Sequence, residues 1–343
     1  MITVDIHPND IDPSLWNELV SHTPNDIHSI YQTYEWAKLM KETCSLTPVF
    51  LLVYKNFNII GGQLFFRKPI FFFLRSYESQ GGPLVIDEDN FETVETVVIE
   101  NYQKIWNLSL YLLTRPKISD NSDTKYLEKG FQKSKFYTFL LNLNTNEKEL
   151  WDSFHKHIRN SVRKAEKSGL KFIEAETWEG WLKFYRLHVD HSNRRGIAPK
   201  SEEFFKILFE QFIPKDMAKL FVVHDEGDLV GGMLFLKFQN VMTYYIGVSD
   251  DNYSKCSPND FLMWNSIRWG SGNKIETLDL GDTWPYPESH LFSIHKFKEK
   301  WGGTLISRDF YIRGNLYRMG RNFVLNNRMM QSLYESLHKH KII

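Results

Sequence analysis

Two stretches of the chain share one pattern of apolar and polar positions. Residues 50–66, "FLLVYKNFNIIGGQLFF", and residues 220–236, "LFVVHDEGDLVGGMLFL", each consist of two apolar runs around a short polar turn, and they align without a gap 170 positions apart. This pattern predicts a β-hairpin in each place. Glycine weakens the interior of a strand unless a bulge or a close neighbour requires it, so each glycine pair predicts such a site. The repeat indicates a duplicated unit.

The elements around the two hairpins repeat as well. A helical pattern precedes each hairpin, at residues 29–44 and 201–217. After the second hairpin, alternating positions at 241–248 predict a strand, and residues 257–274 predict a helix with Pro258 just after its start. Residues 275–281 and 304–313 predict two further strands. Helices and strands in this order predict an α/β (α+β) fold.

A strongly amphipathic helix is predicted between the two copies, within residues 146–169. Its apolar positions recur three and four residues apart and form one stripe: Trp151, Phe154, Ile158, Val162 and Ala165. Its basic positions recur at the same spacing about 130° around the helix, given roughly 100° per residue: Lys156, Arg159, Arg163 and Lys167. The basic stripe is either a solvated face or a binding site for an anion or phosphate.

Composition narrows the class of protein. A chain of 343 residues with 42% hydrophobic residues has room for two domains with their own cores. Lysine plus arginine equals aspartate plus glutamate, at 42 each, so no overall field favours a nucleic-acid or membrane partner. Any basic patch is therefore local, and DNA is not an expected partner.

Cysteine and histidine usage predicts a reducing compartment and no metal site. Cys44 and Cys256 lie one in each copy and fit neither a disulfide framework nor a paired metal motif. His188 and His191 lack the further ligands that zinc requires. The start, "MITVDIHPNDIDPSLW", has acids and a proline where a secretory signal has a basic and then an apolar stretch. We therefore expect a cytoplasmic protein.

The order helix, hairpin with a hydrophobic-Gly-Gly second strand, strand, helix, strand resembles the GNAT acyltransferase fold. Two tandem copies resemble the Fem family of peptidoglycan-bridge aminoacyl transferases. Three motifs carry this resemblance over most of residues 30–305: "YQTYEWAKLMK", "IRNSVRKAEKSGLKF", and "SPNDFLMWNSIRWGSGNKIETLDLG" followed by "HKFKEKWGG". Residues 172–220 hold no extended heptad run, so the chain is similar to the compact members that lack a coiled-coil arm.

The resemblance implies two tandem GNAT-like domains, each a mixed, mostly antiparallel sheet flanked by helices. We expect the first domain at residues 1–145, on the acceptor side and without a transferase site, and the second at 146–315, with the transferase site. Residues 316–343 are expected to form a basic helix that packs on the first domain. From Arg308 onward the chain has seven lysines or arginines against two acids. This tail is either solvated or in contact with tRNA phosphate or the anionic inner face of the membrane.

The resemblance also implies a function. We expect an N-acyltransferase that forms an amide on an amine of a cell-envelope (peptidoglycan) precursor, such as a nucleotide- or lipid-linked amino sugar or peptide. The segment "SDDNYSKCSPND" has no Gly-x-Gly and three aspartates near the start of a helix, which disfavours a bound pyrophosphate. Aminoacyl-tRNA is therefore the expected co-substrate, with no tightly bound cofactor. Two alternatives stay open: an acyl-CoA-dependent N-acyltransferase acting on an amino sugar of a surface polysaccharide, and a non-catalytic RNA- or lipid-head-group-binding module.

N-acyl transfer requires a donor for the developing oxyanion and a route for a proton. The resemblance places Lys298 in the site as the stabilising cation, with Phe297 beside it to stack on a base or ring; the alternative is a surface lysine next to a core phenylalanine. Asp279, at the end of a strand, is either the proton acceptor or a turn cap. Of Tyr244 and Tyr245, one points its hydroxyl into the cleft, and we choose Tyr245.

The expected substrate-binding residues are mostly cations. Arg159 and Arg163 have guanidinium groups suited to phosphate oxygens. Lys38 and Lys41 bracket the position at which the resemblance implies a lysine. Arg195, in a polar segment, either adds to the same basic cleft or is solvated. Asn259 is either a helix cap or a substrate contact.

Overall fold

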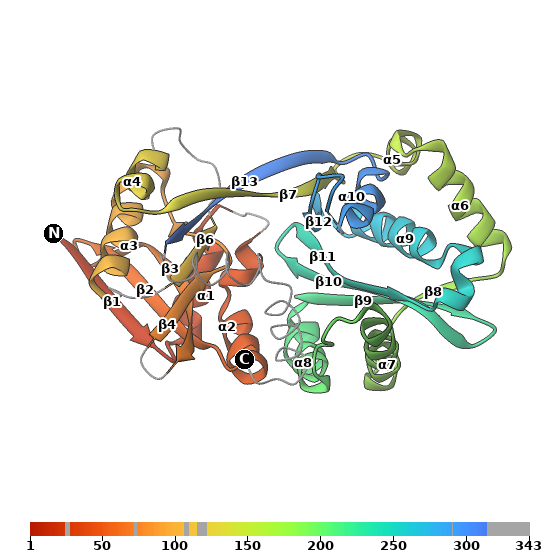
Figure 1. Cartoon of the computed structure of the whole chain (residues 1–343), viewed down its shortest axis with the longest axis horizontal. Helices are drawn as coiled ribbons and strands as arrows, with labels where there is room; N and C mark the ends of the chain where they lie inside the picture. The colour runs from red at the N-terminus through yellow and green to blue at the C-terminus, as the bar shows by residue number, and fades with distance from the viewer. Residues whose placement is uncertain (25–27, 72–73, 106–109, 115–121, 290, 314–343) are drawn as a thin grey trace. The chain divides into compact units, whose positions relative to one another are not determined.

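The computed structural model describes residues 1–24, 28–71, 74–105, 110–114, 122–289 and 291–313 (Figure 1). The chain divides into two compact units. Unit 1 consists of Met1–Lys135 together with the described residues from Arg308 onward, and unit 2 consists of Phe136–Ser307. The sequence placed these divisions at 145/146 and 315/316. The predicted tail helix, 316–343, lies outside the described residues.

Unit 1 is built around one mixed sheet. Its strands lie in the order β1 (Ile2–Pro8), β2 (Thr47–Lys55), β3 (Asn58–Phe71), β4 (Leu74–Ser79) and β6 (Leu110–Thr114), with the short β5 (Leu84–Val85) beside β3. β4 and β6 are parallel, and the other described pairs are antiparallel. The helices are α1 (Pro13–His22), α2 (Tyr34–Cys44), α3 (Phe91–Ile105) and α4 (Ser122–Glu128). The last strand of this copy is β7 (Gln132–Asn142).

Unit 2 repeats this plan. Its strands lie in the order β12 (Thr277–Thr283), β11 (Val241–Ser249), β10 (Asp228–Phe238), β9 (Ala218–Asp225) and β8 (Lys171–Glu174), and β11 and β12 form the parallel pair. Its helices are α5 (Glu147–Ser153), α6 (Lys156–Lys167), α7 (Trp178–Arg195), α8 (Glu202–Ile207), α9 (Pro258–Gly272) and α10 (Phe292–Glu299). The last strand within the described residues is β13 (Thr304–Arg313). The predicted mixed, mostly antiparallel sheets flanked by helices are confirmed.

The two hairpins match in register as well as in sequence. In unit 1 Val53 faces Gly61, and the register shifts at the next pair because Ile60 is an extra residue. In unit 2 Val223 faces Gly231, and the same shift occurs. A β-bulge therefore precedes the glycine pair in both copies, as the sequence predicted.

The glycines of each pair let helices approach both faces of the sheet. A Cβ at Gly61 would lie 2.8 Å from a side chain of α3, and one at Gly231 would lie 3.2 Å from a side chain of α9. The second glycines face the other layer: a Cβ at Gly62 would lie 3.0 Å from a side chain of α1, and one at Gly232 would lie 2.6 Å from a ring of α7. The same pair of close approaches in each copy supports duplication.

Each unit completes its sheet with the last strand of the other copy. The end of β7 belongs to unit 2, where Tyr137 faces Thr283 and Asn142 faces Thr277 on β12. The end of β13 belongs to unit 1, where Phe310 faces Thr114 on β6. The unit divisions therefore fall inside these two strands, ahead of the predicted divisions.

The helix predicted across residues 146–169 is wrong in one respect, because the structure has two helices there. α5 ends at Ser153, and the backbone of Phe154 is extended, with ψ at 150°. Phe154 is buried in the core of unit 2, so the break turns its ring inward. The apolar stripe of α6 is as predicted, with Ile158, Val162 and Ala165 fully buried.

Two further observations concern the described residues as a whole. The helices in this part of the chain are all too short or too polar to cross a membrane. Cys44 and Cys256 are both free thiols.

Candidate active site

The parallel strands of unit 2 separate after three residue pairs. β11 and β12 are paired from Val241 and Thr277 up to Thr243 and Asp279, and both strands continue beyond this point. A bulge in β11 at Tyr245 and a register shift in β12 after Asp279 accompany the separation. We call this point of separation the fork. It leaves main-chain groups of both strands without their usual ladder partners, which makes it a natural place for a site.

Gly281 brings the two arms of the fork close together. Its φ of +74° lies in the left-handed region that favours glycine. A Cβ there would lie 2.9 Å from the main-chain oxygen of Tyr244 and 3.5 Å from Nζ of Lys298. Any larger residue would push the lysine or the strand away, so the position requires glycine.

Lys298 is buried at the fork, with 5% of its surface exposed. Its ammonium on α10 donates a hydrogen bond of 2.7 Å to the main-chain oxygen of Asp282 and lies 5.8 Å from the centre of the Tyr244 ring. Burial lowers the pKa of Lys298 to about 8, against the opposite effect of Asp279 and Asp282. The alternative of a surface lysine is therefore wrong: this is a desolvated cation close to its neutral form.

Asp279 shapes the β12 arm of the fork. Its carboxylate is 4% exposed and accepts hydrogen bonds from the main-chain N–H of Gly281, at 2.8 Å, and from the hydroxyl of Thr138. The same hydroxyl lies 2.9 Å from the main-chain oxygen of Gly281. Asp279 and Thr138 together hold the turn that presents Gly281 and Asp282 to Lys298.

No pattern in the sequence pointed to Thr138. It lies on β7, the last strand of the first copy, 141 positions before Asp279. Only the exchange of last strands brings it to this place, and no local spacing predicts that pairing.

The other two predicted catalytic residues, Phe297 and Tyr245, pack against other side chains of unit 2. Phe297 packs on the core of unit 2, and the ammonium of Lys300 sits over its ring at 4.4 Å. Tyr245 stacks on Phe204 of α8, with ring centres 6.0 Å apart. Of the tyrosine pair it is Tyr244 that accompanies Lys298, and burial raises the pKa of its hydroxyl.

The two predicted phosphate-binding arginines have different surroundings. One guanidinium nitrogen of Arg159 donates to three main-chain oxygens at the end of α5, at 2.9 to 3.4 Å, and so satisfies carbonyl groups that a helix end leaves unpaired. Arg163 is exposed, with its guanidinium carbon 5.4 Å from the centre of the Trp151 ring.

The other predicted binding residues lie on other elements. Lys38 and Lys41 lie on α2 of unit 1, where Lys41 donates to the main-chain oxygen of Asn9 at 3.1 Å. Arg195 is exposed at the end of α7. Asn259 donates to the hydroxyl of Ser249 at 2.9 Å. Its alternative role as a helix cap is wrong, because the cap position of α9 belongs to Ser257.

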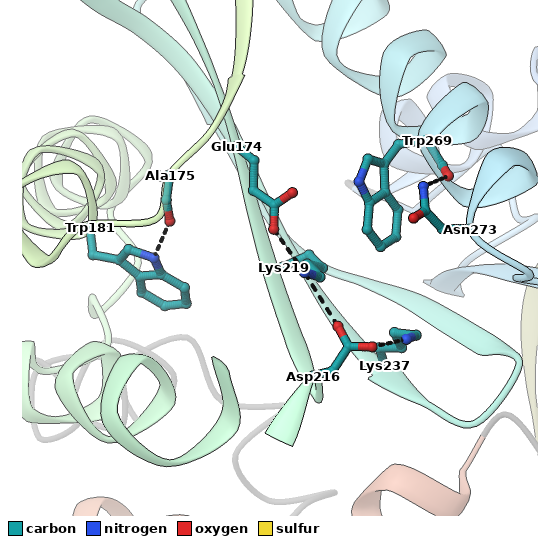
Figure 2. A network of polar contacts seen from close by, with 8 residues as sticks. All are labelled: Glu174, Ala175, Trp181, Asp216, Lys219, Lys237, Trp269 and Asn273. Carbon is teal, nitrogen blue, oxygen red and sulfur yellow. Dashed lines mark hydrogen bonds and ion pairs between the residues drawn. The ribbon is translucent and has the colours of Figure 1, made fainter. Parts of the chain in front are cut away.

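A second group of charges in unit 2 is internally paired (Figure 2). Lys219 of β9 lies between Glu174, at 2.8 Å, and Asp216, at 3.3 Å, and Asp216 also pairs with Lys237. The ammonium of Lys219 also faces the ring of Trp269, at 5.2 Å. Because each charged group of this cluster is paired with another, we interpret the cluster as a structural network. Across the described ranges, three or more His, Cys, Asp or Glu side chains nowhere gather in a way that could hold a metal ion.

Known proteins resemble the chain in both sequence and fold. The acetyltransferase (GNAT) domain family matches residues 152–286. A lipid II:glycine glycyltransferase of Staphylococcus epidermidis is 22% identical, over 87% of this chain and 91% of its own length. The crystal structure of FemX superimposes with a TM-score of 0.72 at 17% identity, over 89% of this chain and 96% of FemX. The structure of a tandem GNAT protein from the clavulanic acid biosynthesis pathway superimposes with a TM-score of 0.56 at 10% identity, over 91% of this chain and 98% of that protein. The predicted tandem GNAT-like fold is confirmed.

Proposed function

We propose that the chain is a Fem-type acyltransferase with tandem GNAT-like domains, and that it transfers an aminoacyl group from aminoacyl-tRNA to an amine of a peptidoglycan precursor. The observation that carries this proposal is the buried ammonium of Lys298 at the fork, held by one main-chain oxygen beside two aspartates. A desolvated cation of this kind stabilises a developing oxyanion far better than one in water.

The proposed reaction forms one C–N bond and breaks one C–O bond. The acceptor amine attacks the ester carbon of the donor, and the negative charge that develops on the carbonyl oxygen faces the ammonium of Lys298. The C–O bond of the ester then breaks, and the proton that the attacking nitrogen loses ends on the departing ribose oxygen, which leaves as a hydroxyl group. Asp279 and Thr138 act through position, because they hold the turn that carries Asp282.

The choice of donor rests first on the connection between β11 and α9. Asp250 and Asp251 lie there, and the carboxylate of Asp250 accepts a hydrogen bond from the main-chain N–H of Asn252 at 2.9 Å. Asp260 occupies the first turn of α9 and pairs with Lys300 at 2.6 Å. A pyrophosphate would meet negative charge here, where free N–H groups would be needed to bind it. This disfavours acyl-CoA.

The exposed face of α6 supports a polyanionic donor. The side opposite its buried residues carries four exposed cations, Lys156, Arg163, Lys164 and Lys167. Within the described part of the chain, the three lysines have no ion pair or hydrogen bond. Such a row along about 18 Å of helix, at 1.5 Å per residue, suits a phosphate backbone.

We assign the acceptor to a lipid-linked precursor, because the Staphylococcus epidermidis relative is named for lipid II. A nucleotide-linked precursor is the related choice. Such an acceptor implies a cytoplasmic protein that works at the inner face of the membrane. We place the acceptor against the first copy, where the helix that corresponds to α10 carries Lys125 in a surface ion pair with Glu92 at 2.8 Å. Lys125 is thus a partly exposed, paired lysine and does not match the buried ammonium of Lys298.

The second candidate function is acyl-CoA-dependent N-acylation of an amino sugar. The match of residues 152–286 to an acetyltransferase (GNAT) domain favours it. The two functions differ in the donor, so labelled donors separate them.

Purified protein is incubated with lipid II in detergent micelles and, in separate reactions, with total tRNA charged with radiolabelled amino acids or with radiolabelled acetyl-CoA. We expect label from the charged tRNA to enter lipid II. Lys298→Ala should lower this rate by about 10²- to 10³-fold. Lys296→Ala is the control, because Lys296 lies exposed on the same helix and pairs with Glu299. Label entering from acetyl-CoA alone would reverse the assignment of the donor.

A binding measurement tests the role of α6. Lys156→Ala, Lys164→Ala and Lys167→Ala together should weaken tRNA binding and lower the slope of log affinity against log salt concentration by about 2. Lys183→Ala serves as control, because Lys183 is an exposed lysine of α7 that pairs with Glu179 at 2.9 Å. An unchanged slope in the triple variant would assign the basic face of α6 to solvation.

A further inference from the structure

Two aromatic residues lie exposed directly after β12. Trp284 is 38% exposed and Tyr286 is 45% exposed, although large aromatic side chains are usually buried. Ile294, at 39% exposed, lies on α10 in the same connection. Exposed apolar side chains gathered in one segment mark a binding surface more often than scattered ones do.

The segment that carries them is stiff. Its sequence, Trp284-Pro285-Tyr286-Pro287, alternates aromatic residues with prolines. Proline fixes its own φ and restricts the residue before it to an extended backbone, so both aromatic residues have few conformations. Tyr286 is fixed further, because its hydroxyl lies 3.3 Å from that of Tyr137 and the two rings meet edge to face. The two rings therefore need little ordering when a ligand binds.

This pair lies next to the reacting end of the site. Asp282, whose main-chain oxygen holds Lys298, is two residues before Trp284. Ile294 is four residues before Lys298 on α10, so it lies on the same face of the helix one turn away. The aromatic pair and Ile294 are therefore close in sequence or helical position to the groups that hold the buried ammonium.

The charges nearby point to a neutral ring as the ligand. Asp282 and Glu288 are exposed acids of the same segment, and Lys296 is paired with Glu299. These acids would repel a phosphate group or an anionic lipid head group. A nucleobase is flat and uncharged, it offers an N–H group that can donate a hydrogen bond to a carboxylate, and stacking on aromatic side chains is a common way to bind it.

We infer that Trp284 and Tyr286 form a stacking platform for a nucleobase of one of the two substrates. The inference deepens the proposed function, since it uses Lys298 as the marker of the reacting end. The base has three sources: the terminal adenosine that carries the aminoacyl ester, the adenine of CoA, or the uracil of a nucleotide-linked acceptor. The titration below separates adenine from uracil, and the labelled donors of the transfer assay separate the two sources of adenine.

Wild-type protein and variants are titrated calorimetrically with AMP, CoA and UDP, each up to millimolar concentration. Trp284→Ala should weaken binding of the nucleotides that carry the stacked base about tenfold, the effect of losing one stacked ring, and Trp284→Phe should retain most of the affinity. Ile173→Ala is the control, because Ile173 is a similarly exposed apolar residue on β8. A loss for AMP and CoA alike assigns adenine, a loss for CoA alone assigns acyl-CoA, and a loss for UDP assigns the acceptor.

Equal affinities in wild type and Trp284→Ala, or no binding of any of the three nucleotides, would overturn the inference. A loss in Trp284→Ala of binding to neutral phosphatidylcholine vesicles, with nucleotide binding unchanged, would also overturn it and assign the surface to the bilayer. Because binding is measured without turnover, the inference can fail while transfer to lipid II is still observed. Conversely, absence of transfer with intact, Trp284-dependent nucleotide binding would count against the proposed function alone.

Discussion

The hydrogen bond of Lys298 goes to the main-chain oxygen of Asp282, at 2.7 Å, and joins a buried cation to a neutral acceptor. A carbonyl group satisfies one N–H of the ammonium but does not cancel its charge. Burial therefore outweighs the attraction of Asp279 and Asp282, and the pKa of Lys298 falls to about 8. The protein holds a charge that it would be more stable without.

Replacement of Lys298 by methionine should stabilise the folded protein at pH 7. The pKa of Lys298 is about 8 when folded and 10.5 in its reference state, so between these values the unfolded chain binds more protons. The free energy of unfolding of the wild type therefore rises with pH across this window, by about 3 kcal/mol from this residue. Lys298→Met lacks that rise. Urea unfolding of both proteins at pH 7.5 and pH 10 measures it, and parallel pH dependences would contradict the shift.

The activity should fall as pH rises, whereas the free energy of unfolding rises. If the ammonium stabilises the oxyanion, kcat/KM falls as pH rises through about 8, because the cation is lost. Lys298→Arg keeps a charge at all these pH values, so its residual activity should show no fall near pH 8. Profiles of kcat/KM from pH 6 to 10 check both statements. A wild-type rate that rises through pH 8 would instead make neutral Lys298 a proton acceptor.

Thr138→Val should impair the turn that carries Asp282. The substitution removes the hydroxyl that bonds Asp279 and leaves a buried carboxylate with one donor fewer, at a cost of about 1–3 kcal/mol of stability. We expect kcat to fall about tenfold, and the pH at which activity falls to move as Lys298 shifts. Thr138→Ser restores the hydroxyl and should rescue both readouts. A variant with lower stability but unchanged kcat and pH profile would limit Thr138 to folding.

The sequence predicted the two copies and their elements, because hydrophobic spacing and glycine pairs are local signals; the choice of Lys298 came from the family resemblance. It did not predict the break at Phe154, since the apolar stripe of Trp151, Phe154 and Ile158 continues at helical spacing. We chose Tyr245 from the sequence, whereas the ring that lies near Lys298 is that of Tyr244. Which of Tyr244 and Tyr245 faces the fork depends on the bulge in β11, and a bulge changes side-chain alternation without a mark in the sequence.

Arg159 and Arg163 should respond differently to alanine substitution. Arg159→Ala removes donors from three carbonyl oxygens at the end of α5 and should lower stability by about 1–2 kcal/mol. Arg163→Ala loses only an exposed contact with Trp151 and should change stability by about 0.5 kcal/mol or less. Thermal unfolding and tRNA binding of both variants test this. Equal destabilisation by the two substitutions would mean that the end of α5 does not depend on Arg159.

The glycine pairs should tolerate no side chain in either copy. In Gly62→Ala the new Cβ would lie 2.5 Å from the main-chain oxygen of Leu51, and in Gly232→Ala it would lie 2.6 Å from the ring of Phe184. Both variants should lose about 1–3 kcal/mol or more, as overpacked cores do. Gly272→Ala, at the end of α9 with open space around it, should be neutral or slightly stabilising. Denaturant titration ranks the three, and a stable Gly232→Ala would contradict the close approach of α7.

The exchange of β7 and β13 limits how this protein can change over evolutionary time. A gene fragment that stopped after residue 143 would encode β6 without the strand that Phe310 supplies, and one that began there would encode β12 without Thr138 and its neighbours. Neither copy can thus be shed, shuffled into another gene or produced as a free-standing module with its sheet intact. We therefore expect the two copies to be inherited together, in one gene.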